Sequence, residues 1–422
     1  MHSRYGTRLH ILGLLALAPL MTLTVLAEDA ADVSSWLEWG GPQRNFMQED
    51  AGLAETWPES GPKVLWTKEL GGGYSSVLVE GDMVYTVEHR GEDDVVLALS
   101  AADGRTKWEA AYPSKPVEDQ SIEFGKGPNS TALIAGDRLC SIGYNAHLHC
   151  FDKTTGKKVW MRDLVGEYGA TRSHFGYSAA LIAHEDLVLA VVGGEQAGMM
   201  GFALADGEPK WKSETFDVSY DSPQIIDILG EKQVVLMGAT EVLGIALADG
   251  KIRWRRVHVN QYKTNCTGPF WNGKDLLFVT AQADAGSRTL RFSKKDGSIH
   301  VEDVNENKKF GMFHNTGLLV GDILYGASGN ILSAYDIRQG EEIWKERGFP
   351  KTNLLAAGDK ALSLDENGKL SLLTLSPEKV TVHASHSVLD KPAWTPPTLV
   401  GTTLYVRNKE KLVALELGAS GS

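Results

Sequence analysis

Several polar and aromatic side chains fall where they could hold a ligand, at the starts of predicted strands or in the connections between them. Glu88 and Arg90 could bind a polar ligand as a pair of opposite charges, or form a surface ion pair of small energetic value. Asn129 begins a predicted strand, so its side chain could reach inward. Each candidate could instead only pack against its neighbours. The candidate ligand or partner contacts are Glu88, Arg90, Asn129, Tyr177, Tyr220, His314, Trp394 and Arg407.

No complete catalytic set of a familiar kind stands in the sequence. A Gly-x-Ser-x-Gly elbow, a His-Glu-x-x-His helix and a phosphate-binding loop are all missing. His147 and His149 alternate along one predicted strand, and His383 and His386 are separated by two residues. Neither pair comes with the four ligands of a structural zinc site. We therefore expect no catalytic and no metal-binding residue.

The three cysteines are Cys140, Cys150 and Cys266. Cys140 and Cys150 fall on neighbouring predicted strands whose turn is near Asn145, so they would face each other. In an exported protein they could form a disulfide, and otherwise they would be two buried thiols. Cys266 would then be the unpaired cysteine.

One phrase recurs along the chain and predicts the elements that must position these residues. An apolar strand runs into a tight turn with Gly, and a short strand ending in Trp follows, as in Leu97–Trp108 and Cys150–Trp160. Units of about 40 to 50 residues with four strands each are typical of propeller blades. The periodic placement of the Trp residues indicates packing between blades. These structural tryptophans are Trp66, Trp108, Trp160, Trp211, Trp254 and Trp344.

The two ends of the repeat complete the count. Three strands between residues 394 and 417 follow the seventh full unit, and Lys63–Trp66 matches the missing fourth strand. We predict an all-β, eight-bladed propeller of four-stranded antiparallel blades, with the last blade closed by an N-terminal strand that removes an exposed edge. The predicted segments are a signal peptide (1–27), an N-terminal extension (28–61), the propeller (62–417) and a C-terminal tail (418–422).

Strand order also separates two faces of the propeller. Counting strands A to D from the channel outward, the short A-to-B and C-to-D turns lie on one side, here named the turn face. The D-to-A and B-to-C connections lie on the other side, the loop face. Loops on a rigid scaffold usually carry function, so we expect the site at the loop-face mouth of the central channel. The long connections there are 111–128, 165–176, 257–265, 347–351 and 383–393.

The N-terminus has the pattern of a secretory signal. Arg4 and Arg8 precede an apolar stretch from Ile11 to Leu26, and small residues favour cleavage after Ala27. The alternative is an uncleaved anchor, for which the stretch is short. We expect a periplasmic or secreted protein. Its formal net charge of −12 is poorly suited to nucleic acid or anionic lipid.

The repeat, with phrases such as Gly127–Thr131, Ser219–Pro223 and Leu404–Asn408, resembles the pyrroloquinoline-quinone-type repeat propellers. That family includes quinoprotein dehydrogenases and the outer-membrane assembly factor BamB. In the dehydrogenases the chemistry needs a Ca²⁺ ion, an Asp base and commonly an adjacent Cys pair. This sequence has no adjacent Cys pair, and no Asp stands in a matching motif.

Three functions remain open at this stage. The leading hypothesis is an exported, non-catalytic scaffold, a monomer without a cofactor, that binds an envelope protein, a small polar ligand or a glycan. One alternative is a quinone-dependent oxidoreductase, such as an alcohol dehydrogenase, with pyrroloquinoline quinone and Ca²⁺. The other is a carbohydrate-binding module.

Overall fold

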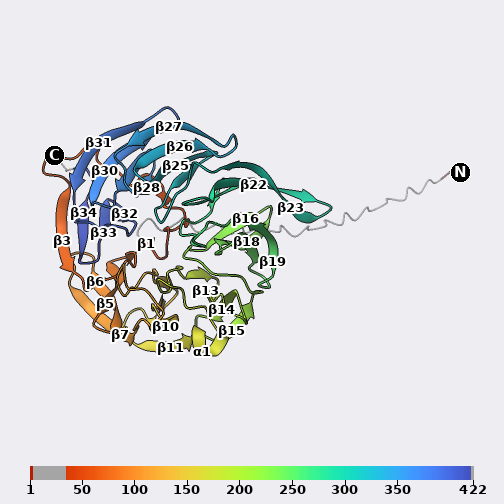
Figure 1. Cartoon of the computed structure of the whole chain (residues 1–422), viewed down its shortest axis with the longest axis horizontal. Coiled ribbons are helices and arrows are strands. Elements are labelled where there is room, and N and C mark those ends of the chain that lie inside the picture. The colour runs from red at the N-terminus through yellow and green to blue at the C-terminus, as the bar shows by residue number, and fades with distance from the viewer. Residues whose placement is uncertain (3–34, 420–422) are drawn as a thin grey trace. The chain divides into compact units, whose positions relative to one another are not determined.

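Short strands make up almost all of the regular structure in the computed structural model, which describes residues 1–2 and 35–419. They form eight sheets arranged as a ring (Figure 1), each built on a blade of four antiparallel strands. The strands follow chain order in seven blades, whereas the eighth takes its outermost strand from the N-terminal part of the chain. The prediction of an eight-bladed all-β propeller is therefore confirmed. The predicted signal peptide lies outside the described residues except for its first two.

The first four blades follow one another without a change in strand order. Blade 1 consists of β4 (Leu78–Glu80), β5 (Met83–Arg90), β6 (Asp93–Ser100) and β7 (Thr106–Pro113). Blade 2 consists of β8 (Leu133–Ala135), β9 (Arg138–Ile142), β10 (His147–Asp152) and β11 (Lys158–Asp163), followed by helix α1 (Leu164–Tyr168). Blade 3 consists of β12 (Ile182–His184), β13 (Leu187–Val191), β14 (Met199–Ala203) and β15 (Pro209–Lys212). Blade 4 consists of β16 (Gln224–Ile228), β17 (Glu231–Met237), β18 (Glu241–Ala246) and β19 (Ile252–Val257).

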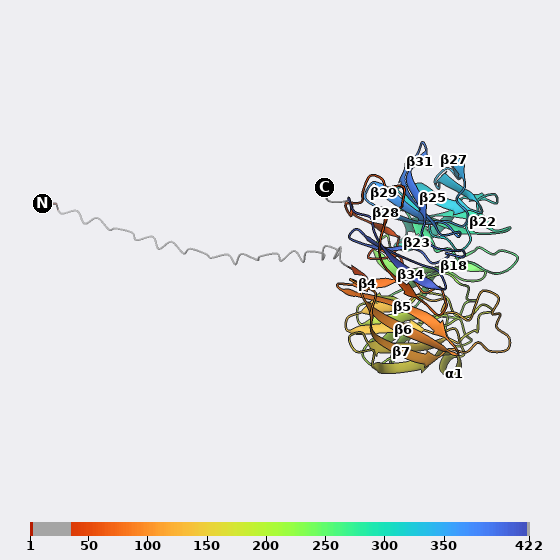
Figure 2. The same ribbon diagram turned by 90° about the vertical axis from the view of Figure 1, so that its left-hand side faces the viewer.

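The last four blades complete the ring, which Figure 2 shows from its edge with α1 at the loop face. Blade 5 consists of β20 (Phe270–Trp271), β21 (Leu276–Ala281), β22 (Gly286–Lys295) and β23 (Ser298–Asn307). Blade 6 consists of β24 (Leu318–Val320), β25 (Ile323–Ser328), β26 (Ile331–Asp336) and β27 (Glu341–Arg347). Blade 7 consists of β28 (Asn353–Ala357), β29 (Lys360–Leu364), β30 (Lys369–Leu375) and β31 (Val380–Ser387). Blade 8 consists of β32 (Thr398–Val400), β33 (Thr403–Arg407), β34 (Lys411–Glu416) and the N-terminal strand β3 (Lys63–Glu69).

Burial explains why the middle strands are so apolar. The interior residues of β5 and β6 are buried on both sides of the sheet, because the neighbouring blades cover both faces, whereas most of the outer strand β7 is exposed or half-buried. Strands covered on both faces read as continuous apolar runs, such as Val95–Leu99. The outermost strand β3 pairs with β34 and places Trp66 opposite Ala414, so the two ends of the propeller hold each other.

The interblade tryptophans connect consecutive blades. The Trp160 indole donates a hydrogen bond of 3.0 Å to the carbonyl of Leu204 in blade 3. Its ring covers Gly207, which has a positive φ. A Cβ at this position would lie only 2.6 Å from the Trp160 ring, so no side chain fits there. Trp66, Trp108 and Trp344 donate in the same way to the next blade. Trp254 instead bonds Gln233 of its own blade, and the Trp211 indole nitrogen has no partner among the described residues.

The N-terminal extension adds two short strands that the repeat did not predict. Strand β1 (Ser35–Trp36) pairs antiparallel with β4 in blade 1, and β2 (Met47–Gln48) pairs parallel with β28 in blade 7. Both pairings join the innermost strand of a blade near its turn-face end. The segment between β1 and β2 therefore crosses the channel at the turn face.

Candidate functional site

Four aromatic or heterocyclic residues occupy one structural position at the loop-face mouth of the channel. Tyr74, Tyr220, His314 and Trp394 each stand four residues before an innermost strand, namely β4, β16, β24 and β32. This position places them around the channel where the long connections enter the blades. Asn129 stands at the equivalent position before β8.

Two phenylalanines from the long connections join these residues into one cluster. Trp394 stacks on Tyr74 with ring centroids 5.4 Å apart and contacts His314 at 5.1 Å. Phe124 lies 5.6 Å from Trp394 and 5.3 Å from Phe175. Phe175 in turn lies 5.9 Å from Tyr220. We name the cluster the aromatic belt, and its members are Tyr74, Phe124, Phe175, Tyr220, His314 and Trp394.

Lysines lie over the faces of two belt residues. The ammonium groups of Lys351 and Lys409 stand 5.3 Å from the ring centroids of Trp394 and Tyr74 respectively. Glu366 accepts a hydrogen bond of 3.4 Å from the Trp394 indole and pairs with Lys351 at 3.3 Å. Burial raises the pKa of Glu366, but the Trp394 hydrogen bond and the lysine charges outweigh it and lower the pKa overall. The belt therefore combines apolar faces with positive charge at its edge.

The eight predicted contacts divide between the belt and internal packing. Tyr220, His314 and Trp394 lie in the belt, and Asn129 supports it by donating a hydrogen bond of 2.8 Å to the carbonyl of Phe175. The buried Tyr177 donates its hydroxyl to Val191 at 2.8 Å within blade 3. These bonds explain why side chains at similar sequence positions face different surroundings.

Arg407 joins blade 8 to blade 1 from a fully buried position. Its guanidinium donates to the carbonyls of Ser75 at 3.0 Å, Gly73 at 2.9 Å and Val87 at 2.9 Å. Burial lowers the pKa of Arg407 to about 10, and the nearby Glu88 opposes that shift. Because these bonds occupy the guanidinium, Arg407 holds the ring closed at this point.

Glu88 and Arg90 form an ion pair on blade 1, in which Arg90 is exposed and the Glu88 carboxylate is buried rather than on the surface. Glu88 is almost fully buried and also accepts a hydrogen bond of 2.7 Å from the amide of Gly71. Arg90 makes a second pair of hydrogen bonds with Glu109, at 3.1 and 2.9 Å. The charges of Glu88 and Arg90 are therefore both paired within blade 1, and Glu88 also accepts from the segment before that blade.

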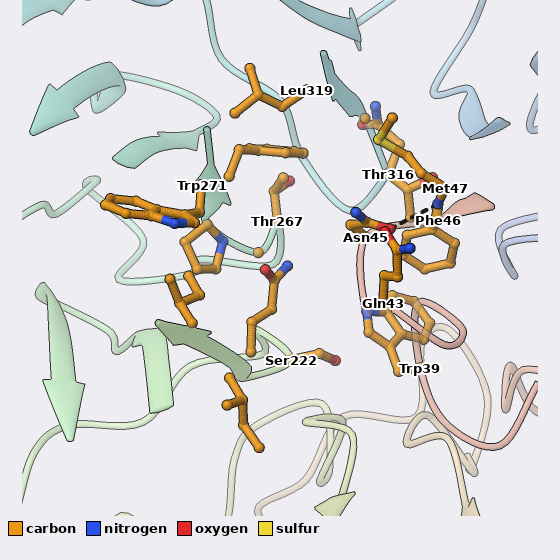
Figure 3. A pocket seen from close by; sticks show the side chains of 18 of the residues that line it. Trp39, Gln43, Asn45, Phe46, Met47, Ser222, Thr267, Trp271, Thr316 and Leu319 are labelled. Atoms are coloured by element: carbon orange, nitrogen blue, oxygen red, sulfur yellow. Dashed lines mark hydrogen bonds between the residues drawn. The ribbon is translucent and has the colours of Figure 1, made fainter. Parts of the chain in front are cut away.

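A cavity of about 380 Å³ lies inside the channel, between the extension and blades 4, 5 and 6. Figure 3 shows Trp39, Gln43 and Asn45 of the extension on one side and Thr267 and Trp271 on the other. We name it the channel cavity. His314 belongs to both its lining and the aromatic belt.

His314 has no hydrogen-bond partner for either ring nitrogen among the described residues. Burial, with the nearby Lys351 charge as a smaller cause, lowers the pKa of His314 to about 4. The imidazole is therefore neutral at pH 7, with one nitrogen able to donate and the other able to accept.

Calcium-bound pyrroloquinoline quinone, the cofactor that a resemblance to the quinoprotein dehydrogenases implies, does not fit the residues that line the channel cavity. Pyrroloquinoline quinone is a tricarboxylate, and carboxylates are held best by charge-assisted hydrogen bonds. The described residues that line the cavity include no lysine or arginine. In the part of the chain that the structure describes, no group of three or more His, Cys, Asp or Glu side chains could hold a metal ion.

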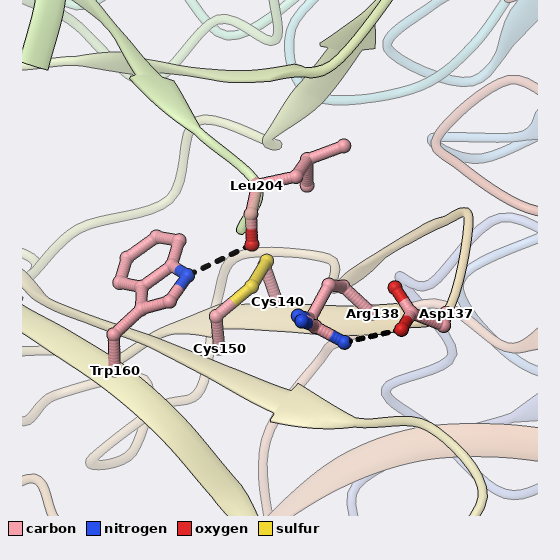
Figure 4. The surroundings of a disulfide bond; sticks show 6 residues. All are labelled: Asp137, Arg138, Cys140, Cys150, Trp160 and Leu204. Atoms are coloured by element: carbon pink, nitrogen blue, oxygen red, sulfur yellow. Dashed lines mark hydrogen bonds and ion pairs between the residues drawn. A yellow bond between two sulfur atoms is a disulfide. The ribbon is translucent and has the colours of Figure 1, made fainter. Parts of the chain in front are cut away.

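The cysteine pair lies in blade 2, away from the belt and the cavity. Cys140 on β9 and Cys150 on β10 are direct register partners, and the structure joins them by a disulfide (Figure 4). The interblade contact from Trp160 to Leu204 lies beside them. Cys266 is free, and burial raises the pKa of its thiol to about 12, so it is a thiol rather than a thiolate at neutral pH.

Sequence reasoning missed three belt residues and the channel cavity. Tyr74 stands four residues before β4, the same position as the three predicted contacts that lie in the belt, and that spacing could have indicated it. Phe124 and Phe175 stand in the long connections, where an aromatic residue in each could have been noticed. The channel cavity gave no sequence signal, because Gln43 comes from the extension whereas Gln224 and Trp271 come from separate blades.

Within the described residues, no helix is both long enough and apolar enough to span a membrane.

Comparison with known proteins agrees with the fold. The profile of a family described as outer membrane protein assembly factor BamB matches residues 43–123 and 114–346, which is most of the chain. No curated protein sequence matches.

Solved structures of two kinds of protein resemble the chain, namely a BamB and dehydrogenases. BamB from Moraxella catarrhalis has a TM-score of 0.59 at 13% identity, covering 84% of this chain and 99% of its own. A europium-containing methanol dehydrogenase has a TM-score of 0.64 at 12% identity, covering 90% and 91%. A quinohemoprotein alcohol dehydrogenase from Comamonas testosteroni has a TM-score of 0.61 at 11% identity, covering 94% and 82%. At such identities the likeness concerns the fold alone.

Proposed function

Because this chain belongs to the family of the outer membrane protein assembly factor BamB, we propose that it is an exported, non-catalytic propeller that binds a partner protein of the cell envelope at its loop face. The signal pattern with cleavage after Ala27 supports export. The family supports a role in the envelope.

The aromatic belt is the observation that carries this proposal. Aromatic residues are enriched in protein interfaces, and a few of them usually supply most of the binding energy. Trp394 is the central member, because it contacts Tyr74, Phe124 and His314.

Two further apolar side chains are exposed on the same face as the belt. Ile122 is 54% exposed and Tyr262 is 63% exposed, and both stand in long loop-face connections. Exposed apolar groups gathered on one face of a protein mark interaction sites. Lys351 and Lys409 at the edge of the belt favour a partner segment that carries acidic residues.

Photo-crosslinking in the cells that make the protein tests the proposal. A benzophenone amino acid at position 124 is expected to crosslink one discrete envelope protein, and Trp394→Ala is expected to remove that product. The control position is Val159 on the outer strand β11. Val159 is 41% exposed and Phe124 is 40% exposed, so the two positions are equally accessible. Equal products from both positions, or a product that survives Trp394→Ala, would contradict a loop-face interface.

A further inference from the structure

The path of the N-terminal extension creates the channel cavity. Hydrogen bonds tie Leu37 to Ile134 of blade 2, Arg44 to Ala183 of blade 3 and Phe46 to Ala356 of blade 7. In the described part of the chain, no hydrogen bond from residues 37–48 reaches blades 4, 5 or 6. The extension therefore lies against one side of the channel and leaves room on the other.

A tight loop holds the extension in this shape. The amide of Phe46 donates to the carbonyl of Gly40 at 2.9 Å, and Arg44 bonds Glu38 at 2.9 Å. Gly41 has φ of +76°, and a Cβ there would come within 2.8 Å of the Trp36 ring. The loop thus presents Trp39, Gln43 and Asn45 to the cavity from a fixed position (Figure 3).

Neutral polar groups on the cavity wall lack protein partners. Gln43 is exposed, and Gln224, Trp39 and Trp271 are half-buried. Their side-chain amides and indole nitrogens make no hydrogen bond within the described residues and are open to the cavity. Both ring nitrogens of His314 are unpaired as well. Donors and acceptors therefore face the same space from the extension and from blades 4, 5 and 6.

The charge of the lining restricts what this space can hold. Asp227, which is exposed, is the one charged side chain among the described residues that line it. A carboxylate or phosphate group would find no cation there. A ligand whose groups both donate and accept hydrogen bonds without charge matches the unpaired amides.

We propose that the channel cavity binds a neutral, hydroxyl-rich ligand of monosaccharide size. Each hydroxyl can pair with an amide, and the flat faces of Trp39 and Trp271 can cover the apolar face of a sugar ring. A volume of about 380 Å³ holds about a dozen water molecules, at about 30 Å³ each. A hexose, with about a dozen non-hydrogen atoms, fits the same space and falls in the size range of small-ligand sites.

Calorimetric titration of the full mature chain tests this site directly. The probes are glucose, galactose and N-acetylglucosamine, with glucuronate as the charged counterpart. At least one neutral sugar is expected to bind with a Kd of about 1 mM or tighter. Gln224→Ala and Trp271→Phe are each expected to weaken that binding about tenfold, since each removes a hydrogen bond without removing the fold.

Gln261→Ala is the matched control, because Gln261 is exposed on a loop-face connection outside the cavity. Its Kd is expected to equal that of the unaltered chain, and thermal unfolding checks that all variants are folded. The proposal is overturned if the unaltered chain binds no neutral sugar below about 10 mM, or if glucuronate binds more tightly than glucose. It is also overturned if Gln224→Ala and Trp271→Phe both leave the Kd unchanged. None of these results depends on the crosslinking at the loop face.

Discussion

Individual tryptophans connect the blades, and two of them differ in a way that isolates one hydrogen bond. Trp160 donates to Leu204, whereas the Trp211 indole nitrogen is buried without a partner in the described structure. Both rings cover the glycine of the next turn, Gly207 and Gly250 respectively. The two sites therefore share their packing and differ mainly in the hydrogen bond.

Trp160→Phe is expected to lower the free energy of unfolding by about 1 kcal/mol more than Trp211→Phe does. The first change removes a hydrogen bond and leaves a carbonyl unpaired, whereas the second removes a buried donor that had no partner. Urea unfolding of both variants provides the comparison. Equal losses would show that the indole nitrogen of Trp160 adds nothing beyond its ring.

At the scale of elements, the hairpin of β9 and β10 explains why the first two cysteines meet. A turn between Ile142 and His147 places Cys140 opposite Cys150. The two cysteines are ten positions apart in the sequence, so the disulfide closes a short loop. A crosslink over so short a loop stabilises a protein by about 2 to 3 kcal/mol, mostly by restricting the unfolded chain.

Reduction is therefore expected to lower the Tm of the protein by about 3 °C. A variant with both Cys140→Ala and Cys150→Ala should show a Tm that does not respond to reductant. Cys266→Ala is the control, and it should respond as the unaltered chain does. Mass spectrometry of the alkylated mature protein measures the same bond, and two free thiols at positions 140 and 150 would rule it out.

At the scale of the whole molecule, buried histidines connect stability with pH. Burial lowers the pKa of His149 to about 3 and that of His258 to about 4, with neighbouring positive charges as smaller causes. Both residues are buried, His149 has no partner for either ring nitrogen, and His258 has none for Nε2, within the described residues. In the folded state both are held neutral, whereas in the unfolded chain they take up protons near pH 6.5.

Stability from these histidines is fully present above pH 6.5 and is lost as the pH falls toward 4. Each should cost about 1 kcal/mol for each pH unit below 6.5. Urea unfolding at pH 7.5 and pH 5.5 measures the loss. His149→Phe should reduce the loss, because phenylalanine takes up no proton in the unfolded chain and its ring can still stack on Tyr112. The exposed His300→Gln variant is the control. A loss of the same size in His149→Phe would assign the effect to other groups.

The sequence by itself determined the blade count, the closure by Lys63–Trp66 and the interblade tryptophans. These features depend on local spacing and on turns such as the one at Gly207, so each repeat carries its own signal. It also placed Tyr220, His314 and Trp394 at one position before an innermost strand, and these residues belong to the belt.

Only the tertiary structure decided which side chains contact one another and which have their hydrogen-bonding groups already paired inside the protein. Tyr177 stands shortly before the innermost strand β12, much as belt residues do before theirs, and Arg407 ends β33, but the hydrogen bonds of both side chains lie inside the ring. The channel cavity depends on the path of residues 37–48, which follow no repeat and contact blades far away in the chain. Such contacts arise from ring closure, which brings distant residues together without leaving a periodic pattern in the sequence.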